Sequence, residues 1–187
     1  MLALLLSVAL IAAACGDDDD DDATTADEVT TLTLTGAQTT LALDADTAAI
    51  LTDNGIEVAP VDPATAGDDG ISFPITGGEV DADTLAGTIN HSGGLAFTAG
   101  GTTLELTDFV IDTTAGTLTA TAGGDQVVIL DVDLTGLQRT DGDDGIELTG
   151  ITTTLSQDGA DALNATFDVE LFEQGIAIGN VTVLATA

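Results

Sequence analysis

Residues 95–134 read LAFTAGGTTLELTDFVIDTTAGTLTATAGGDQVVILDVDL, a stretch that contains the clearest strand and turn signals of the chain. Apolar and polar residues alternate along it, as they do in strands that bury one face of a sheet. The alternating apolar residues are Leu95/Phe97, Leu104/Leu106, Phe109/Ile111 and Val128/Leu130/Val132/Leu134. Glycines at Gly100–Gly101, Gly116 and Gly123–Gly124 separate these segments and are typical of hairpin turns. The stretch therefore predicts consecutive antiparallel strands.

The same alternation continues on both sides of this stretch. It recurs at Leu32/Leu34, Ile146/Leu148, Ile151/Leu155, Ile176/Ile178 and Val181/Val183. Short strands separated by glycine turns are typical of β-sandwiches and barrels. We therefore expect an all-β domain, folded as an antiparallel β-sandwich or a barrel-like meander, with two short helices at its corners.

Capping residues predict the two helices. The segment DADTAAILTDNG begins at Asp44, a typical N-cap, and stops at Asn54–Gly55. The segment SQDGADALNATF has Ser156 or Asp158 as its cap and is weakened by Gly159.

Similar sequences lead into both helices. TTLALDADTAA begins at Thr39, and TTLSQDGADAL begins at Thr153. In a composition so rich in Thr, Ala and Asp, this similarity indicates two equivalent strand-to-helix corners rather than a duplicated chain.

The charge balance is extreme. There are 33 Asp and Glu residues against a single base, Arg139, and the formal net charge is −32. Nucleic-acid binding depends on Lys and Arg that neutralise phosphates, so this composition excludes it. The composition favours adaptation to high salt, which screens self-repulsion. The alternative is an acidic secreted protein kept soluble by its charge. We expect Arg139 to pair with a neighbouring carboxylate.

The first residues are typical of an export signal. Residues 2–14 are small or apolar apart from Ser7, which suits the apolar region of a signal peptide and is too short to cross a bilayer. The sequence AAAC, from Ala12 to Cys15, resembles the lipobox of bacterial lipoproteins. This resemblance implies that Cys15 carries a thioether-linked diacylglycerol, with fatty acids such as palmitate, and becomes the mature N-terminus.

The chain is predicted to have three parts: a signal peptide at 1–14, an acidic tether at 15–28 and a β-rich extracytoplasmic domain at 29–187. The six aspartates from Asp17 to Asp22 repel one another, which extends the tether and holds the domain off the membrane. Cys15 is the only cysteine, so the chain contains no disulfide or thiol partner for it. The alternative for Cys15 is an unmodified buried thiol. The expected location is the outer face of the cell membrane.

Two further motifs carry a family resemblance. GTINHSGGLAF contains Gly87, His91, Gly94 and Leu95, and VIDTTAGTLTA supplies a strand and turn after it. Together they resemble segments of uncharacterised actinobacterial surface proteins and, more distantly, the HtaA-type haem-acquisition domain. The resemblance implies a haem or small-ligand carrier in which His91 is the candidate ligand-binding residue.

In that family, a tyrosine assisted by a histidine holds the haem iron, whereas this chain has no tyrosine. The resemblance therefore leaves His91 as an iron ligand without the tyrosinate that favours ferric iron. Only Arg139 is available to pair with haem propionates. The alternative for His91 is a structural polar residue at a strand end beside a turn.

Catalysis has little support in the sequence. His91 and Ser92 are neighbours, so on a strand their side chains point to opposite faces. Ser72 and Ser156 remain as nucleophiles for a hydrolase. Among 33 acids, a pair at glycosidase spacing is not diagnostic, and the chain has no Trp or Tyr on which a sugar would stack.

Acidic loops raise the alternative of calcium binding. The acids of DGDDG, from Asp141 to Gly145, do not follow the EF-hand spacing, and Thr152 stands where that motif has glutamate. We therefore expect no dedicated metal site and no resident cofactor, with haem and calcium as alternatives.

The sequence thus predicts a lipid-anchored cell-surface domain with a non-catalytic role, either structural or in binding a ligand or partner. Its partners would be the membrane, through Cys15, and a cell-wall component or surface protein. A haem or small-ligand carrier is the first alternative, and a hydrolase is the second.

Overall fold

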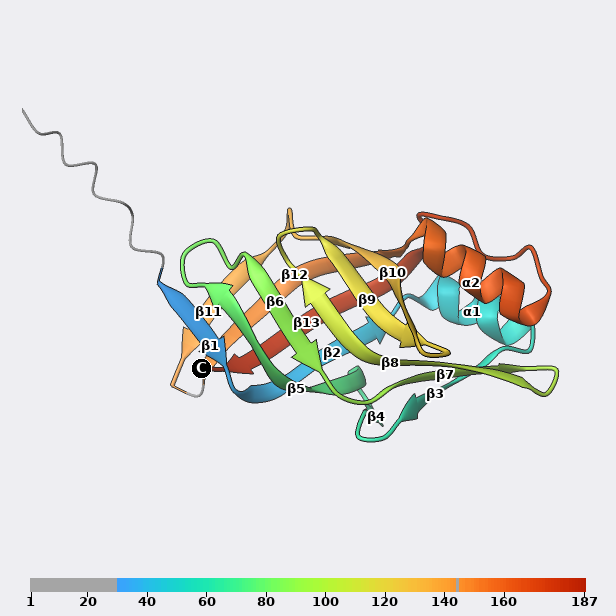
Figure 1. The fold of residues 1–187 in the computed structure, drawn as a ribbon, viewed down its shortest axis with the longest axis horizontal. Coiled ribbons are helices and arrows are strands. Elements are labelled where there is room, and N and C mark those ends of the chain that lie inside the picture. Colours follow the sequence, from blue (N-terminus) through green and yellow to red (C-terminus); the bar gives the residue numbers. More distant parts are fainter. Residues whose placement is uncertain (1–29, 144) are drawn as a thin grey trace, which may run out of the picture.

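The computed structural model describes residues 30–143 and 145–187 (Figure 1). The predicted signal peptide, Cys15 and the acidic tether lie outside these described residues. The strands are β1 (Thr31–Leu34), β2 (Gly36–Leu43), β3 (Glu57–Val61), β4 (Thr65–Gly67), β5 (Gly70–Asp81), β6 (Gly87–His91), β7 (Gly94–Ala99), β8 (Thr102–Asp112), β9 (Thr117–Ala122), β10 (Asp125–Asp133), β11 (Gln138–Gly142), β12 (Gly145–Leu155) and β13 (Ala177–Thr186). The helices are α1 (Ala45–Asp53) and α2 (Gln157–Phe167).

Within the described part, eight strands close into an antiparallel barrel, which confirms the barrel form of the predicted all-β fold. Around the ring the order is β5, β2, β13, β12, β10, β9, β8 and β6, and β6 pairs with β5 again. The remaining strands extend this ring: β1 and β4 pair with β5, β11 pairs with β12, and β7 pairs with both β8 and β3. Closure pairs the ring strands on both sides and turns one face of each toward a common interior.

The stretch from residue 95 to 134 folds as predicted. Strands β7 to β10 follow one another as antiparallel neighbours, joined by the three glycine turns. Within β8, Leu106 and Phe109 are both buried, although strict alternation would place them on opposite faces. The ladder shifts between Thr107 and Val110, where Asp108 has a left-handed φ of 53°. This bulge restores the inward phase of the strand.

A second shift lies in β10, between Val128 and Leu130. It buries Ile129 beside Leu130 and leaves Val128 half-buried. Ile129, rather than the predicted Val128, therefore joins Leu130 in the core.

Strands β5 and β6 complete the ring, although the sequence pattern does not single them out. In β5, Phe73 and Ile75 are buried, but Pro74 between them and Gly77 after them are residues that usually interrupt strands. Gly78 is required where β5 meets β6, because a Cβ there would lie 2.2 Å from the Thr88 carbonyl oxygen.

Both predicted helices form, with caps at the expected residues. The Asp44 carboxylate accepts hydrogen bonds from the backbone N–H groups of Asp46 and Thr47, and α1 ends at Asn54. For α2, Ser156 is the cap, and its Oγ accepts from the N–H of Gly159.

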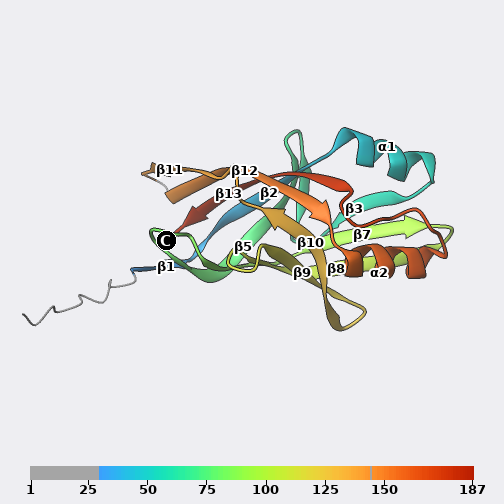
Figure 2. The same cartoon turned by 90° about the horizontal axis from the view of Figure 1, so that it is seen from above.

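The helices lie at the same end of the barrel (Figure 1). Seen from above, they stand on opposite sides of that end (Figure 2). Neither helix of the described ranges combines the length and hydropathy needed to span a bilayer.

The lack of a side chain at Gly159 allows α2 to pack closely against β10 of the barrel. A Cβ at this position would lie 2.5 Å from the Ile129 carbonyl oxygen of β10. We expect Gly159→Ala to lower the free energy of unfolding by about 1–3 kcal/mol, because overpacking outweighs the gain in helix propensity of about 1 kcal/mol. Urea denaturation measures this change. Gln157→Ala, on the exposed side of the same helix, is the control and should change stability by less than about 0.5 kcal/mol. Equal effects of the two substitutions would contradict the close packing.

Candidate functional site

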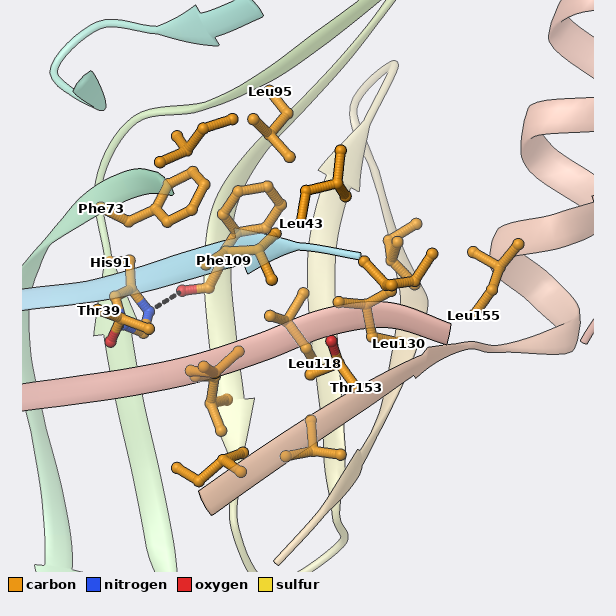
Figure 3. A pocket seen from close by; sticks show the side chains of 18 of the residues that line it. Thr39, Leu43, Phe73, His91, Leu95, Phe109, Leu118, Leu130, Thr153 and Leu155 are labelled. Carbon is orange, nitrogen blue, oxygen red and sulfur yellow. Dashed lines mark hydrogen bonds between the residues drawn. The ribbon is translucent and has the colours of Figure 1, made fainter. Parts of the chain in front are cut away.

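The barrel encloses a cavity of about 120 Å³. Figure 3 shows side chains from several strands converging around it. Its wall consists mainly of Leu, Ile and Val side chains together with Phe73, Phe97, Phe109 and Phe172. The Phe73 and Phe109 rings meet edge to face, with centroids 5.1 Å apart. Such a wall offers water few partners, so the cavity suits a compact apolar molecule.

Five threonines also line the cavity, but each hydroxyl has a partner within the protein. The partners are His91 Nε2 for Thr39, the Ala177 carbonyl for Thr47, the Asp81 carboxylate for Thr84, the Leu85 carbonyl for Thr113 and the Gly179 carbonyl for Thr153. No buried polar side-chain atom of the described residues lacks a hydrogen-bond partner. The cavity therefore offers a ligand no unpaired hydroxyl.

His91 ends β6 and lies in the cavity wall, with 6% of its surface exposed. Its Nδ1 is 3.1 Å from the Phe109 carbonyl oxygen (Figure 3), and its Nε2 is 2.7 Å from Thr39 Oγ1. Because a carbonyl oxygen only accepts, Nδ1 carries the proton and Nε2 accepts from the Thr39 hydroxyl. Burial lowers the pKa of His91 to about 4, against a smaller upward effect of the Phe109 bond. The ring is therefore neutral at neutral pH, and both of its nitrogens are engaged.

The serines considered for a hydrolase do not meet His91. Ser72 Oγ lies 2.9 Å from Thr40 Oγ1, and Thr40 follows the inward-facing Thr39 on β2, so this pair belongs to the opposite face. Ser156 Oγ donates to the Val128 carbonyl and caps α2. The structure thus brings His91 together with Thr39 and Phe109, and with neither serine.

The remaining polar candidates lie elsewhere. Arg139 pairs with Asp141 at 2.7 Å, which confirms the predicted ion pair, and its Nη1 donates to the Ala82 carbonyl. This second bond ties β11 to the turn after β5. Across residues 30–143 and 145–187, no three His, Cys, Asp or Glu side chains gather to hold a metal ion.

The cavity borders the surface beside α1. Leu43, Leu51 and Val58 line both the cavity and a surface groove between α1 and the β3–β7 pair. Leu43 is 37% exposed, so its side chain faces solvent as well as the cavity. Glu57, next to Val58, is an exposed acid in the lining of this groove.

The family resemblance singled out His91, but the sequence pattern did not predict that Thr39 and Thr153 line the cavity. Both are buried and occupy equivalent places in the two similar lead-in segments before the helices. That similarity was the available signal, and the structure places both corners at one end of the barrel (Figure 1).

The buried neutral state of His91 predicts a pH dependence. The unfolded ring takes up a proton near pH 6.5, but the folded ring does so only near pH 4. His91 therefore lowers stability as pH falls through this window, by about 3 kcal/mol in total, and has no such effect above pH 6.5. Because His91 is the only histidine, its ring resonances in NMR report this titration directly. A titration midpoint near pH 6.5 in the folded protein would contradict a buried ring with hydrogen bonds at both nitrogens.

Comparison with known proteins bears on the fold and the family. The model of the HtaA family (Htaa) matches residues 52–171. A search of the curated proteins gives no match. The crystal structure of the C-terminal domain of HtaA from Corynebacterium glutamicum is similar, with a TM-score of 0.63 and 19% identity, over 82% of this chain and 98% of that chain.

Two further structures from Corynebacterium glutamicum are similar. One is the domain-swapped dimer of a variant of that HtaA domain, with a TM-score of 0.54 and 18% identity over 78% of this chain and 95% of that chain. The other is the haem-binding protein HtaB, with a TM-score of 0.46 and 12% identity over 84% of this chain and 96% of that chain. At these identities the HtaA domain structures show a shared fold. Because the family match spans more than half of the sequence, this chain belongs to the HtaA family.

Proposed function

We propose that this chain is a non-catalytic binding protein that carries a compact apolar ligand inside its barrel. The observation that carries the proposal is the cavity of about 120 Å³ with its hydrocarbon wall. An eight-stranded barrel has an interior that side chains either fill or leave open for one small ligand. Burying apolar surface in such a cavity contributes about 0.8 kcal/mol for each CH₂ group of the ligand.

The absence of chemistry at the cavity supports a carrier over an enzyme. Within the described residues, His91 is the only titratable side chain that lines the cavity. Thr39 and the Phe109 carbonyl occupy its two nitrogens. Neither Ser72 nor Ser156 is placed to exchange a proton with it. A bound molecule would therefore meet no activated nucleophile or free base.

Haem, the ligand that the family resemblance implies, does not fit the residues present. His91 would have to give up its bond to Thr39 before Nε2 could bind iron. The cavity of about 120 Å³ is smaller than the roughly 300–1,000 Å³ usual for drug-sized ligands. Arg139, the only base of the chain, is paired with Asp141 and does not line the cavity. His91 is thus assigned to the wall rather than to iron.

Benzene provides a direct test of the cavity. Leu118 points into the cavity (Figure 3), so Leu118→Trp should fill it. We expect benzene to raise the Tm of the unaltered protein, with stabilisation of about 2.7 kcal/mol at about a hundredfold excess over Kd. The shift should be lost in Leu118→Trp, measured against that variant's own Tm. Leu184→Trp is the matched control, because Leu184 is 43% exposed and lies outside the cavity lining. This variant should retain the shift.

Two outcomes would count against the proposal. The first is an absence of any benzene shift in the unaltered protein. The second comes from hemin titration, for which we expect no Soret change that depends on His91. A Soret shift present in the unaltered protein and lost in His91→Gln would favour the haem-carrier alternative.

We further propose that the domain is exported and held at the outer face of the cell membrane by lipid on Cys15. Support comes from the apolar residues 2–14, the AAAC sequence before the glycine, and the acidic run from Asp17 to Asp22. A net charge of −32 with one base suits a salt-rich medium outside the cell. We also propose that the domain has a cell-wall component or a surface protein as its partner.

Metabolic labelling with palmitate tests the anchor. The unaltered chain should incorporate label and sediment with membranes, because two or more acyl chains give stable attachment. Cys15→Ser should abolish both the labelling and the sedimentation. Ser7→Ala, a similar small change within the apolar segment, should alter neither. Equal labelling of Cys15→Ser and the unaltered chain would remove the anchor from this account.

A further inference from the structure

The surface beside the cavity indicates the charge of the end group that a bound molecule would place outside the cavity. This inference rests on the proposed carrier function and concerns the part of the ligand outside the cavity. Leu43, Leu51 and Val58 are shared between the cavity wall and the surface groove beside α1. These three side chains therefore form the wall that separates the cavity from the groove, and a molecule longer than the cavity would reach the groove only where they move aside.

The mainly apolar wall favours a hydrocarbon for the part of the ligand inside the cavity. All five threonine hydroxyls of the wall are bonded to protein groups, and so are both nitrogens of His91. A polar ligand group placed there would lose its bonds to water and would meet no free donor, only the remaining lone pairs of hydroxyl oxygens that are already bonded. Any polar group of the ligand therefore belongs in the groove.

The charges around the groove have one sign. Glu57 lines it directly. The other acids on α1 and its adjoining segments are Asp44, Asp46 and Asp53. Residues 44–57 contain no Lys, Arg or His. A positive end group is attracted to this surface, whereas a carboxylate is repelled.

We propose that the ligand is a cationic amphiphile. Its apolar body occupies the barrel cavity, and its positive end passes Leu43, Leu51 and Val58 to lie beside Glu57 in the groove. The cavity supplies affinity through hydrophobic burial, and the groove selects the sign of the end group. This assignment separates the ligand from fatty acids and from haem, whose polar ends are carboxylates.

Three ligands with the same octyl chain test the proposal: octylammonium, octanol and octanoate. Calorimetry at neutral pH, at the lowest salt concentration at which circular dichroism shows the protein folded, should show octylammonium binding about tenfold or more tightly than octanoate, with octanol between them. Added salt should narrow the difference, because the groove is exposed to solvent.

Substitution of Glu57 locates the effect. Glu57→Gln should weaken octylammonium binding by about two- to fivefold and leave octanol unchanged. Glu147→Gln is the matched control, because Glu147 is an exposed acid on β12 that lines neither the cavity nor the groove. It should leave the affinity for all three ligands unchanged.

The outcomes separate this inference from the proposed function. If octanol binds but octylammonium binds no better than octanoate, the cationic end group is wrong and the apolar carrier stands. If Glu57→Gln and Glu147→Gln weaken octylammonium equally, the groove is not where the end group lies. If none of the three ligands binds and benzene gives no shift, the carrier function itself falls.

Discussion

The barrel closes through the short strand β6, and without this closure neither the cavity nor its wall would form. β6 pairs with β5 on one side and with β8 on the other, so the ring is complete only when both ladders form. Its last residue, His91, adds a side-chain bond to Thr39 of β2 and another to the Phe109 carbonyl of β8. With one base among 33 acids, the chain cannot rely on ion pairs. Neutral hydrogen bonds and apolar burial must therefore hold this ring against the repulsion of its surface.

The interior combines polar residues with an apolar wall without conflict. Thr39 and His91 are hydrogen-bonded to each other, and the other threonines donate to backbone carbonyls or a turn carboxylate. Their polar atoms are thereby engaged within the protein, and the wall remains mainly apolar. Membership in the HtaA family is compatible with the apolar ligand proposed above. The fold provides a barrel, whereas the ligand is decided by the side chains within it. Here the wall offers contact with carbon and no free ligand for iron.

The strands and helices could be predicted from the sequence better than the residues of the cavity. Alternation and glycine turns predicted β7 to β10, and caps at Asp44 and Ser156 predicted both helices, because these signals are local. No strand was predicted for β5, which contains Pro74 and Gly77, residues that usually interrupt strands, although tertiary pairing accommodates both. The bulge at Asp108 and the partnership of Thr39 with His91 arise from contacts between distant strands. No periodicity within one segment reports such contacts. His91 was found through the resemblance of its motif to the HtaA-type domain, but its hydrogen-bonded, neutral state could be seen only in the fold.

The positions of the chain's start and of the helices have a consequence for orientation. The described chain begins at β1, at the end of the barrel opposite α1 and α2 (Figure 1). If the proposed tether enters through β1, the membrane attachment lies at the end of the barrel away from the helices and the groove. A ligand that entered beside α1 would then be taken up at the end of the domain furthest from its attachment.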